Sequence, residues 1–229
     1  MAKVFPVLMV SGILLFNSCN DTEKAIGFEW NVYTTTMQHG DATTAMNSLN
    51  RILAMDAYNA AALDTLAILY QKNGMNEAAA KIAFRALNVR ESDELVKVLA
   101  KANKGMGKHD IALENFQKLL AKDPTSLELL YETAYAYINL GKLNEAIPPL
   151  QKMIDHPESG SAVMKEYVNE GSQLVPYKAV AFNMVGYIQT QAGKNQDALR
   201  SYEAALLIYP KYYLASNNLK LLSERIAGK

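Results

Sequence analysis

Cysteine, histidine and excess charge of either sign are scarce in this sequence, and each scarcity narrows the possible functions. The chain of 229 residues has one cysteine, so it cannot form an internal disulfide. Its three histidines are His39, His109 and His156, which lie far apart, and no phosphate-binding loop or nucleophile motif is present. Lys plus Arg equal Asp plus Glu at 23 each, which leaves no basic surplus for nucleic acid. We therefore expect no enzyme activity, no cofactor, no metal ion and no nucleic-acid partner.

The first nineteen residues differ in character from the rest of the chain. Residues 7–16 are almost entirely apolar, a run too short to span a bilayer but suited to an export signal. Cys19, preceded by the small residue Ser18, resembles the lipobox of bacterial lipoproteins in a form common in Bacteroidota. This resemblance implies a signal peptide over residues 1–18, a lipid on Cys19, and a polar tether over residues 19–25. A cleaved signal without a lipid and an uncleaved anchor are the alternatives.

A repeat of about 34 residues runs through the remainder of the chain. Five glycines fall 34, 33, 34 and 52 residues apart, and an alanine follows each of them after five residues: Gly40 and Ala45, Gly74 and Ala79, Gly107 and Ala112, Gly141 and Ala146, Gly193 and Ala198. Glycine adopts the left-handed conformation at a helix end without strain, so each pair predicts a turn between two helices. A unit this short cannot bury its own apolar face, and neighbouring units must therefore stack into a solenoid.

The individual units resemble the tetratricopeptide repeat (TPR) family. The last full unit carries the residues that pack the paired helices in that family: Phe182, Val185, Gly186, Ala198, Tyr202, Ala205 and Pro210. The resemblance implies an all-α fold, a right-handed α-solenoid of about five helix-turn-helix repeats with a C-terminal capping helix. The expected layout is a TPR domain over residues 26–229, with repeats at 26–59, 60–92, 93–126, 127–160 and 179–212, an insertion at 156–176, and the cap at 213–227.

Two segments depart from the regular repeat. In the first unit, Tyr33 falls where a small residue is expected, and shifting the first helix by one residue returns Trp30 and Tyr33 to apolar packing positions. The insertion contains prolines and glycines that bracket residues 161–170, which favours either a short extra helix or a solvated loop there. Insertions in repeat arrays often form loops at a binding edge.

In the TPR family, side chains of the first helix of each repeat line a concave groove that accepts peptides. At the matching positions this chain has lysines, tyrosines and amides: Lys97, Lys101, Lys104, Tyr131, Tyr135, Asn139, Asn183 and Tyr187. The lysine spacing of i, i+4 and i+7 gives one basic stripe suited to an acidic segment, and the tyrosines offer rigid contact area. A lysine stripe is equally typical of a solvated helix face.

Together these features predict a binding protein of the cell envelope. The lipid would hold it at the outer membrane, on the periplasmic or the surface side, while the groove binds envelope proteins or peptide segments. Its role would be that of an adaptor or assembly factor. The alternative is a surface lipoprotein subunit that assists glycan or nutrient capture. The oligomeric state, the membrane leaflet and the identity of the partner stay open.

Overall fold

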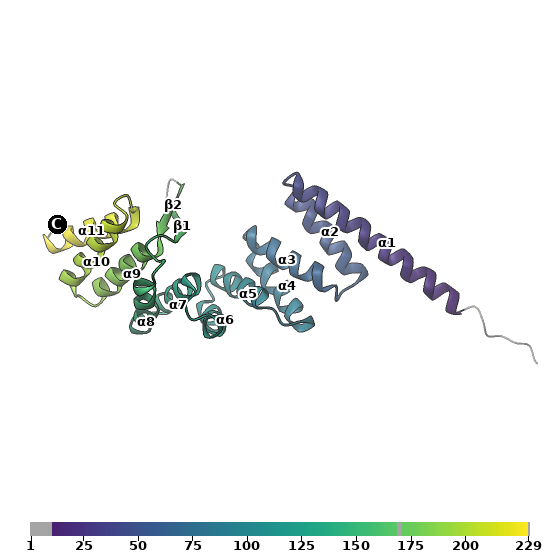
Figure 1. Cartoon of the computed structure of the whole chain (residues 1–229), viewed down its shortest axis with the longest axis horizontal. Coiled ribbons are helices and arrows are strands. Elements are labelled where there is room, and N and C mark those ends of the chain that lie inside the picture. Colours follow the sequence, from purple (N-terminus) through teal and green to yellow (C-terminus); the bar gives the residue numbers. More distant parts are fainter. Residues whose placement is uncertain (1–10, 169–170, 229) are drawn as a thin grey trace, which may run out of the picture. The chain divides into compact units, whose positions relative to one another are not determined.

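The computed structural model describes residues 11–168 and 171–228, with side chains from residue 21 onward. In these residues the chain forms eleven helices, joined by short turns, and one two-stranded hairpin (Figure 1). The predicted helical solenoid fold is confirmed. The chain divides into two compact units, residues 1–106 and residues 107–229.

Unit 1 consists of helices that pack against their neighbours in sequence: α1 (Ser11–Gln38), α2 (Ala42–Met55), α3 (Ala60–Lys72), α4 (Asn76–Val89) and α5 (Asp93–Gly105). Its core is built from small and aliphatic side chains, among them Ala67 and Leu66, which are fully buried. Trp30 and Tyr33 pack against this core with their rings edge to face, 5.5 Å between centroids.

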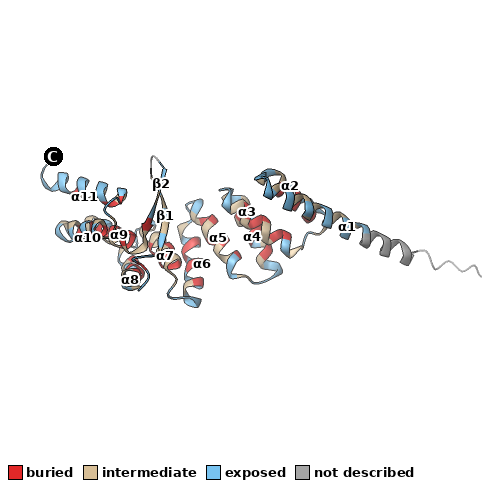
Figure 2. Ribbon diagram, turned by 45° about the horizontal axis from the view of Figure 1, so that its top comes forward, coloured by how far each residue is buried: buried red, intermediate tan, exposed pale blue. Residues whose placement is uncertain are grey.

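Unit 2 contains the remaining helices and the hairpin: α6 (His109–Lys122), α7 (Leu127–Asn139), α8 (Leu143–Asp155), β1 (Val163–Val168), β2 (Gly171–Pro176), α9 (Tyr177–Gln191), α10 (Asn195–Ile208) and α11 (Tyr213–Ile226). Successive helices pack against one another, and α9 also contacts α7, α11 and β2. Figure 2 shows that buried residues follow the helix sides that meet neighbouring helices.

The repeat glycines close the turns as the spacing predicts. Gly40, Gly74, Gly107, Gly141 and Gly193 all have φ between 71° and 75°. In this left-handed region a side chain with a Cβ atom is strained, whereas glycine is not. Each of the five turns therefore depends on glycine for its backbone rather than for close packing, because a Cβ at any of these positions would meet no atom within 4 Å.

The insertion forms a β-hairpin, so of the two alternatives predicted for residues 161–170, a short extra helix or a solvated loop, the helix is wrong. The strands pair antiparallel, with Met164 opposite Val175 and Glu166 opposite Gln173. Exposure alternates along β1 with the period of two that a half-covered strand requires. Val175 is fully buried among residues of α9, α10 and α11. Packing on the repeat helices, together with cross-strand hydrogen bonding, stabilises the two strands.

The N-terminal helix is longer than the repeat requires. Residues 19–25, expected as a tether, continue α1, which begins at Ser11. The signal prediction for residues 1–10 falls outside the described residues, and Cys19 is placed by its backbone alone. Within the part of the chain that the structure describes, no helix combines the length and the apolar content needed to cross a membrane.

Candidate functional site

An aromatic row on α7 is the most developed feature at the predicted site. The rings of Tyr131 and Tyr135 lie one helical turn apart with their centroids 6.0 Å apart and a tilt of 35°. On the far side of Tyr135, the ring of His109 from the start of α6 approaches it at 6.1 Å, nearly edge-on at 64°. Offset and edge-to-face contacts of this kind fix the ring orientations. The row is thus a rigid surface before any partner binds.

Tyr131 forms the buried end of this row. It packs against the cluster that holds Val175 of the hairpin, and burial raises the pKa of its hydroxyl, with further contributions from the carboxylates of Glu132 and Glu166. Glu132 is itself only 5% exposed. The hydroxyl of Tyr131 therefore stays protonated, and the ring is positioned beneath the hairpin rather than on open surface.

Asn183, predicted for the groove, lies in a buried polar network instead. Its side chain is 7% exposed, donates to the Tyr212 hydroxyl at 3.4 Å, and accepts from the Asn218 amide at 2.9 Å. Tyr212 is fully buried and also hydrogen-bonds the Glu166 carboxylate of the hairpin. Burial raises the pKa of Glu166, although the Tyr212 hydrogen bond acts in the opposite direction. The network joins α9, α11 and the hairpin.

The Gln173 side chain joins the hairpin to the start of α11 by hydrogen bonds. The Gln173 amide nitrogen donates to the Lys211 carbonyl at 2.7 Å, and its oxygen accepts from the Tyr213 backbone N–H at 3.1 Å. The Gln173 amide thus donates one hydrogen bond to the backbone of this turn and accepts another from it. These two bonds fix the position of β2 against the turn between α10 and α11. Gln173, Glu166 and Tyr212 were not predicted as site residues, because their partners lie 29 or more positions away in the sequence.

Tyr135, Asn139 and Tyr187 remain on the accessible part of this surface. Asn139 is exposed and donates to the Tyr135 carbonyl at 2.8 Å, one turn back on its own helix. Tyr187, on the neighbouring α9, is 40% exposed. We call the surface of Tyr135, Asn139 and Tyr187, with Tyr131 at its buried end, the α7–α9 face. Its accessible part is aromatic and amide-rich, and the hairpin lies at its buried end.

The predicted lysine stripe belongs to unit 1. Lys97, Lys101 and Lys104 lie along α5 and are half-buried, and each takes part in a polar or electrostatic interaction. They are therefore more constrained than the residues of a purely solvated helix face. The residues of the α7–α9 face and the buried Asn183 all belong to unit 2, so the predicted site residues fall into two groups, one in each unit.

Metal ligands do not converge in the described residues. No group of three or more His, Cys, Asp and Glu side chains there is arranged to hold a metal ion. The buried Nδ1 atom of His109 has no hydrogen-bond partner, and this ring instead makes its contact with Tyr135.

Comparison with known proteins gives consistent matches to one repeat type. Residues 99–126 and residues 115–147 each match a tetratricopeptide repeat model. No curated protein sequence matches the chain significantly. Among solved structures, YrrB, described as a TPR protein with an unusual peptide-binding site, is similar at a TM-score of 0.69 and 19% identity, over 87% of this chain and 97% of that one.

Structures of MamA are similar as well. One MamA structure matches with a TM-score of 0.64 and 19% identity, over 79% of this chain and 95% of its own. MamA from Desulfovibrio magneticus RS-1 matches with a TM-score of 0.67 and 13% identity, over 82% and 97%. At such identities the likeness concerns the fold. The chain therefore contains tetratricopeptide repeats and has the α-solenoid fold of the proteins built from them.

Proposed function

We propose that this protein is a lipid-anchored adaptor of the cell envelope that binds segments of other envelope proteins on its α7–α9 face. The observation that carries the proposal is the aromatic row of His109, Tyr135 and Tyr131, which is fixed at its buried end by the hairpin and accessible at Tyr135. Rigid tyrosines give contact area at little cost in side-chain entropy, which is why they are enriched at protein interfaces.

The fold supports a binding role rather than catalysis. Proteins with TPR repeats generally act as non-enzymatic scaffolds, and YrrB, a structural neighbour, is described as having a peptide-binding site. Each further repeat adds surface to such a scaffold without creating a catalytic site. The charged residues of the two units would favour partner segments of different charge. The lysines of α5 suit acidic residues, whereas Glu132 and Glu166 beside Tyr131 disfavour them on the α7–α9 face.

Photo-crosslinking in the native bacterium tests the binding face. A photoreactive phenylalanine derivative at position 135 is expected to give one dominant adduct with an envelope protein, identified by mass spectrometry of the membrane fraction. The same derivative at Tyr58, which is 78% exposed in unit 1, is the matched control and should not give that adduct. Tyr187→Ala should remove the adduct from position 135. Equal adducts from positions 135 and 58 would contradict a specific face.

A double charge reversal on α5 tests whether unit 1 also binds the partner protein. If α5 holds an acidic part of the partner, Lys97→Glu with Lys101→Glu should weaken recovery of the crosslinked partner and reduce the salt sensitivity of binding. An unchanged adduct yield and salt profile would restrict binding to unit 2.

The anchor is tested separately from the binding face. Metabolic labelling with an alkyne fatty acid should label the protein, and Cys19→Ala should abolish the label and release the protein from the membrane fraction. Helicity measured by circular dichroism should be unchanged, because the substitution lies ahead of the repeats. Labelling of the Cys19→Ala variant would show that the lipid is attached to another residue.

A further inference from the structure

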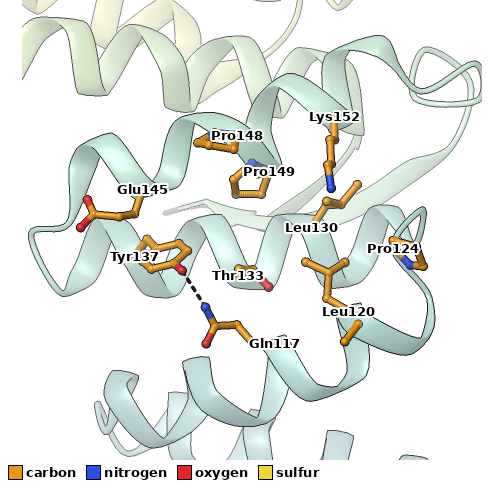
Figure 3. Close-up of a pocket in the computed structure, with 11 residues that line it drawn as sticks. Gln117, Leu120, Pro124, Leu130, Thr133, Tyr137, Glu145, Pro148, Pro149 and Lys152 are labelled. Carbon is orange, nitrogen blue, oxygen red and sulfur yellow. Dashed lines mark hydrogen bonds between the residues drawn. The ribbon is translucent and has the colours of Figure 1, made fainter.

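An open cavity lies on the side of α7 opposite Tyr135. It has a volume of about 540 Å³ and is bordered by α6, α7, α8 and the turn that follows α6. Its floor is formed by Leu130, Thr133 and Tyr137 of α7 (Figure 3). Thr133 and Tyr135 are two positions apart, which places them about 200° apart around the helix. The cavity is therefore separate from the α7–α9 face.

The lining combines an apolar centre with polar atoms at defined places. Leu120 and Pro124 from the α6 side and Pro148 and Pro149 from α8 supply most of the apolar surface. At one end, the Gln117 amide donates to the Tyr137 hydroxyl at 2.6 Å (Figure 3). A volume of several hundred cubic ångströms with few polar groups is typical of a ligand pocket.

Acceptor groups at this cavity lack the donors they would ordinarily have. Thr133 is 3% exposed, and its buried hydroxyl has no hydrogen-bond partner. Prolines have no N–H, so α8 lacks the two helical hydrogen bonds that residues 148 and 149 would otherwise donate beside the cavity. Buried polar groups are ordinarily satisfied, and leaving one unpaired is destabilising. A ligand that brings N–H donors would correct this deficit.

Opposite charges flank the cavity. Glu145 lies at one end and Lys152 at the other, with Pro148 and Pro149 between them (Figure 3). Seven positions along a helix span about 10.5 Å, at roughly 1.5 Å per residue. An extended peptide covers that distance in about three residues, at roughly 3.3 Å each. The charge spacing thus matches a short extended segment.

We propose that this cavity binds an extended segment of a partner protein in which a basic and an acidic residue, three positions apart, flank aliphatic side chains. The basic residue pairs with Glu145 and the acidic residue with Lys152, while an aliphatic side chain contacts Leu120 and Pro149. A backbone N–H of the segment donates to the Thr133 hydroxyl. Because this site is separate from the α7–α9 face, the protein can hold two segments at once.

Synthetic peptides test the charge pattern directly. The probes are acetylated and amidated hexapeptides with the cores Lys-Val-Leu-Asp, Asp-Val-Leu-Asp, Lys-Val-Leu-Lys and Lys-Gly-Gly-Asp, titrated against the full chain in detergent micelles by NMR. Lys-Val-Leu-Asp is expected to bind tightest and to shift amide signals of α6, α7 and α8 only. Equal binding of all four peptides, binding of none, or shifts centred on α9 would overturn the proposal.

Variants of the exposed lining residues give the matched controls. Glu145→Lys should weaken Lys-Val-Leu-Asp about tenfold and strengthen Asp-Val-Leu-Asp, because the favoured charge at that end is inverted. Gln151→Lys places a lysine on α8 outside the cavity and should leave the preference unchanged. Ala121→Phe fills the cavity from an exposed position and should abolish binding without unfolding the helices. Unchanged binding by Glu145→Lys or Ala121→Phe would contradict the proposed site.

Thr133→Val separates a binding role from a structural one. The substitution keeps the shape and removes the unpaired hydroxyl, so the melting temperature should stay the same or rise. Affinity for the Lys-Val-Leu-Asp peptide should instead fall about threefold, the size expected for one lost hydrogen bond. A variant that melts lower and binds equally well would show that the hydroxyl stabilises the fold and takes no part in binding.

Discussion

The two units use the same repeat but bury different chemistry. Unit 1 encloses alanines and aliphatic residues, and its Tyr70 lies at the margin, where the hydroxyl meets the exposed Asn50. Unit 2 buries whole tyrosines, with Tyr202 2% exposed and Tyr212 fully enclosed. Tyr202 occupies a packing position of the repeat itself, whereas Tyr212 is buried where the hairpin and the terminal helix α11 join the repeat. The hairpin and α11 therefore add a buried polar network to the core of unit 2.

Alanine substitutions at two close-packed glycines, Gly186 in unit 2 and Gly105 in unit 1, should give the largest difference in stability between the units. A Cβ at Gly186 of α9 would lie 2.6 Å from the Tyr202 ring, and that ring is fixed by a hydrogen bond of 3.1 Å between its hydroxyl and Thr190. Gly186→Ala should therefore lower the free energy of unfolding by about 2 kcal/mol through overpacking. Urea denaturation, with hydrogen exchange of α9 and α10, measures the effect.

The control for Gly186→Ala is Gly105→Ala in unit 1. There the added Cβ would meet the Asn76 side chain, which can rotate away. Alanine also has the higher helix propensity, by about 1 kcal/mol in a helix interior. Gly105→Ala should consequently be neutral or stabilising. Equal losses for both variants would show that the tyrosine ring is no more rigid an obstacle than the asparagine.

Removal of a single tyrosine hydroxyl should give the next smaller difference in stability between the two units. Tyr212→Phe breaks the buried contacts with Glu166 and Asn183, and we expect a loss of about 1.5 kcal/mol. Tyr70→Phe removes a bond to an exposed asparagine and should cost less than about 0.5 kcal/mol. Chemical denaturation gives the totals, and hydrogen exchange of α11 assigns the loss to unit 2. If the two variants lost equal stability, the buried network would contribute no more than a surface bond.

The repeat was predictable because its signals are local. Each glycine turn depends on one residue whose backbone conformation only glycine adopts easily, and the glycines recur every 33 or 34 residues except across the insertion, where the spacing is 52. Small residues at fixed offsets then place the paired helices. The register shift of the first helix stays a prediction, and the side chains of Trp30 and Tyr33 pack partly buried against the core of unit 1.

The hairpin and its network were not predictable from the same signals. Prolines and glycines around the insertion fit a short helix as well as a hairpin, and the sequence of β1, Val-Met-Lys-Glu-Tyr-Val, lacks the alternation of apolar and polar residues that would predict a strand. The burial of Asn183 depends on Tyr212, which is 29 positions away, so its position in the repeat gave no indication of it. The position of a residue in the repeat predicts the helix face on which its side chain lies. Whether that face is exposed depends on the inserted hairpin as well.

Two glutamates should give opposite pH dependences, the smallest effect we predict. Burial raises the pKa of Glu166 above its ordinary value of 4.5. The stability linked to Glu166 is fully present below 4.5 and is lost as pH rises through its higher native pKa, because the native state must then ionise a buried group. Glu166→Gln should therefore match the natural chain near pH 4.5 and become the more stable of the two as pH rises.

Glu29 in unit 1 has the opposite sign. Its hydrogen bond from Arg51, at 2.7 Å, lowers its pKa below 4.5. Its contribution is complete above 4.5 and is lost as pH falls through the lowered native value, because protonation removes the acceptor charge. Glu29→Gln should thus be the less stable form at neutral pH and converge with the natural chain in acid. Urea titrations of both variants across this range measure the two trends. Parallel trends would mean that the carboxylates have similar environments, and the contrast between a paired surface charge in unit 1 and a buried carboxyl in unit 2 would fail.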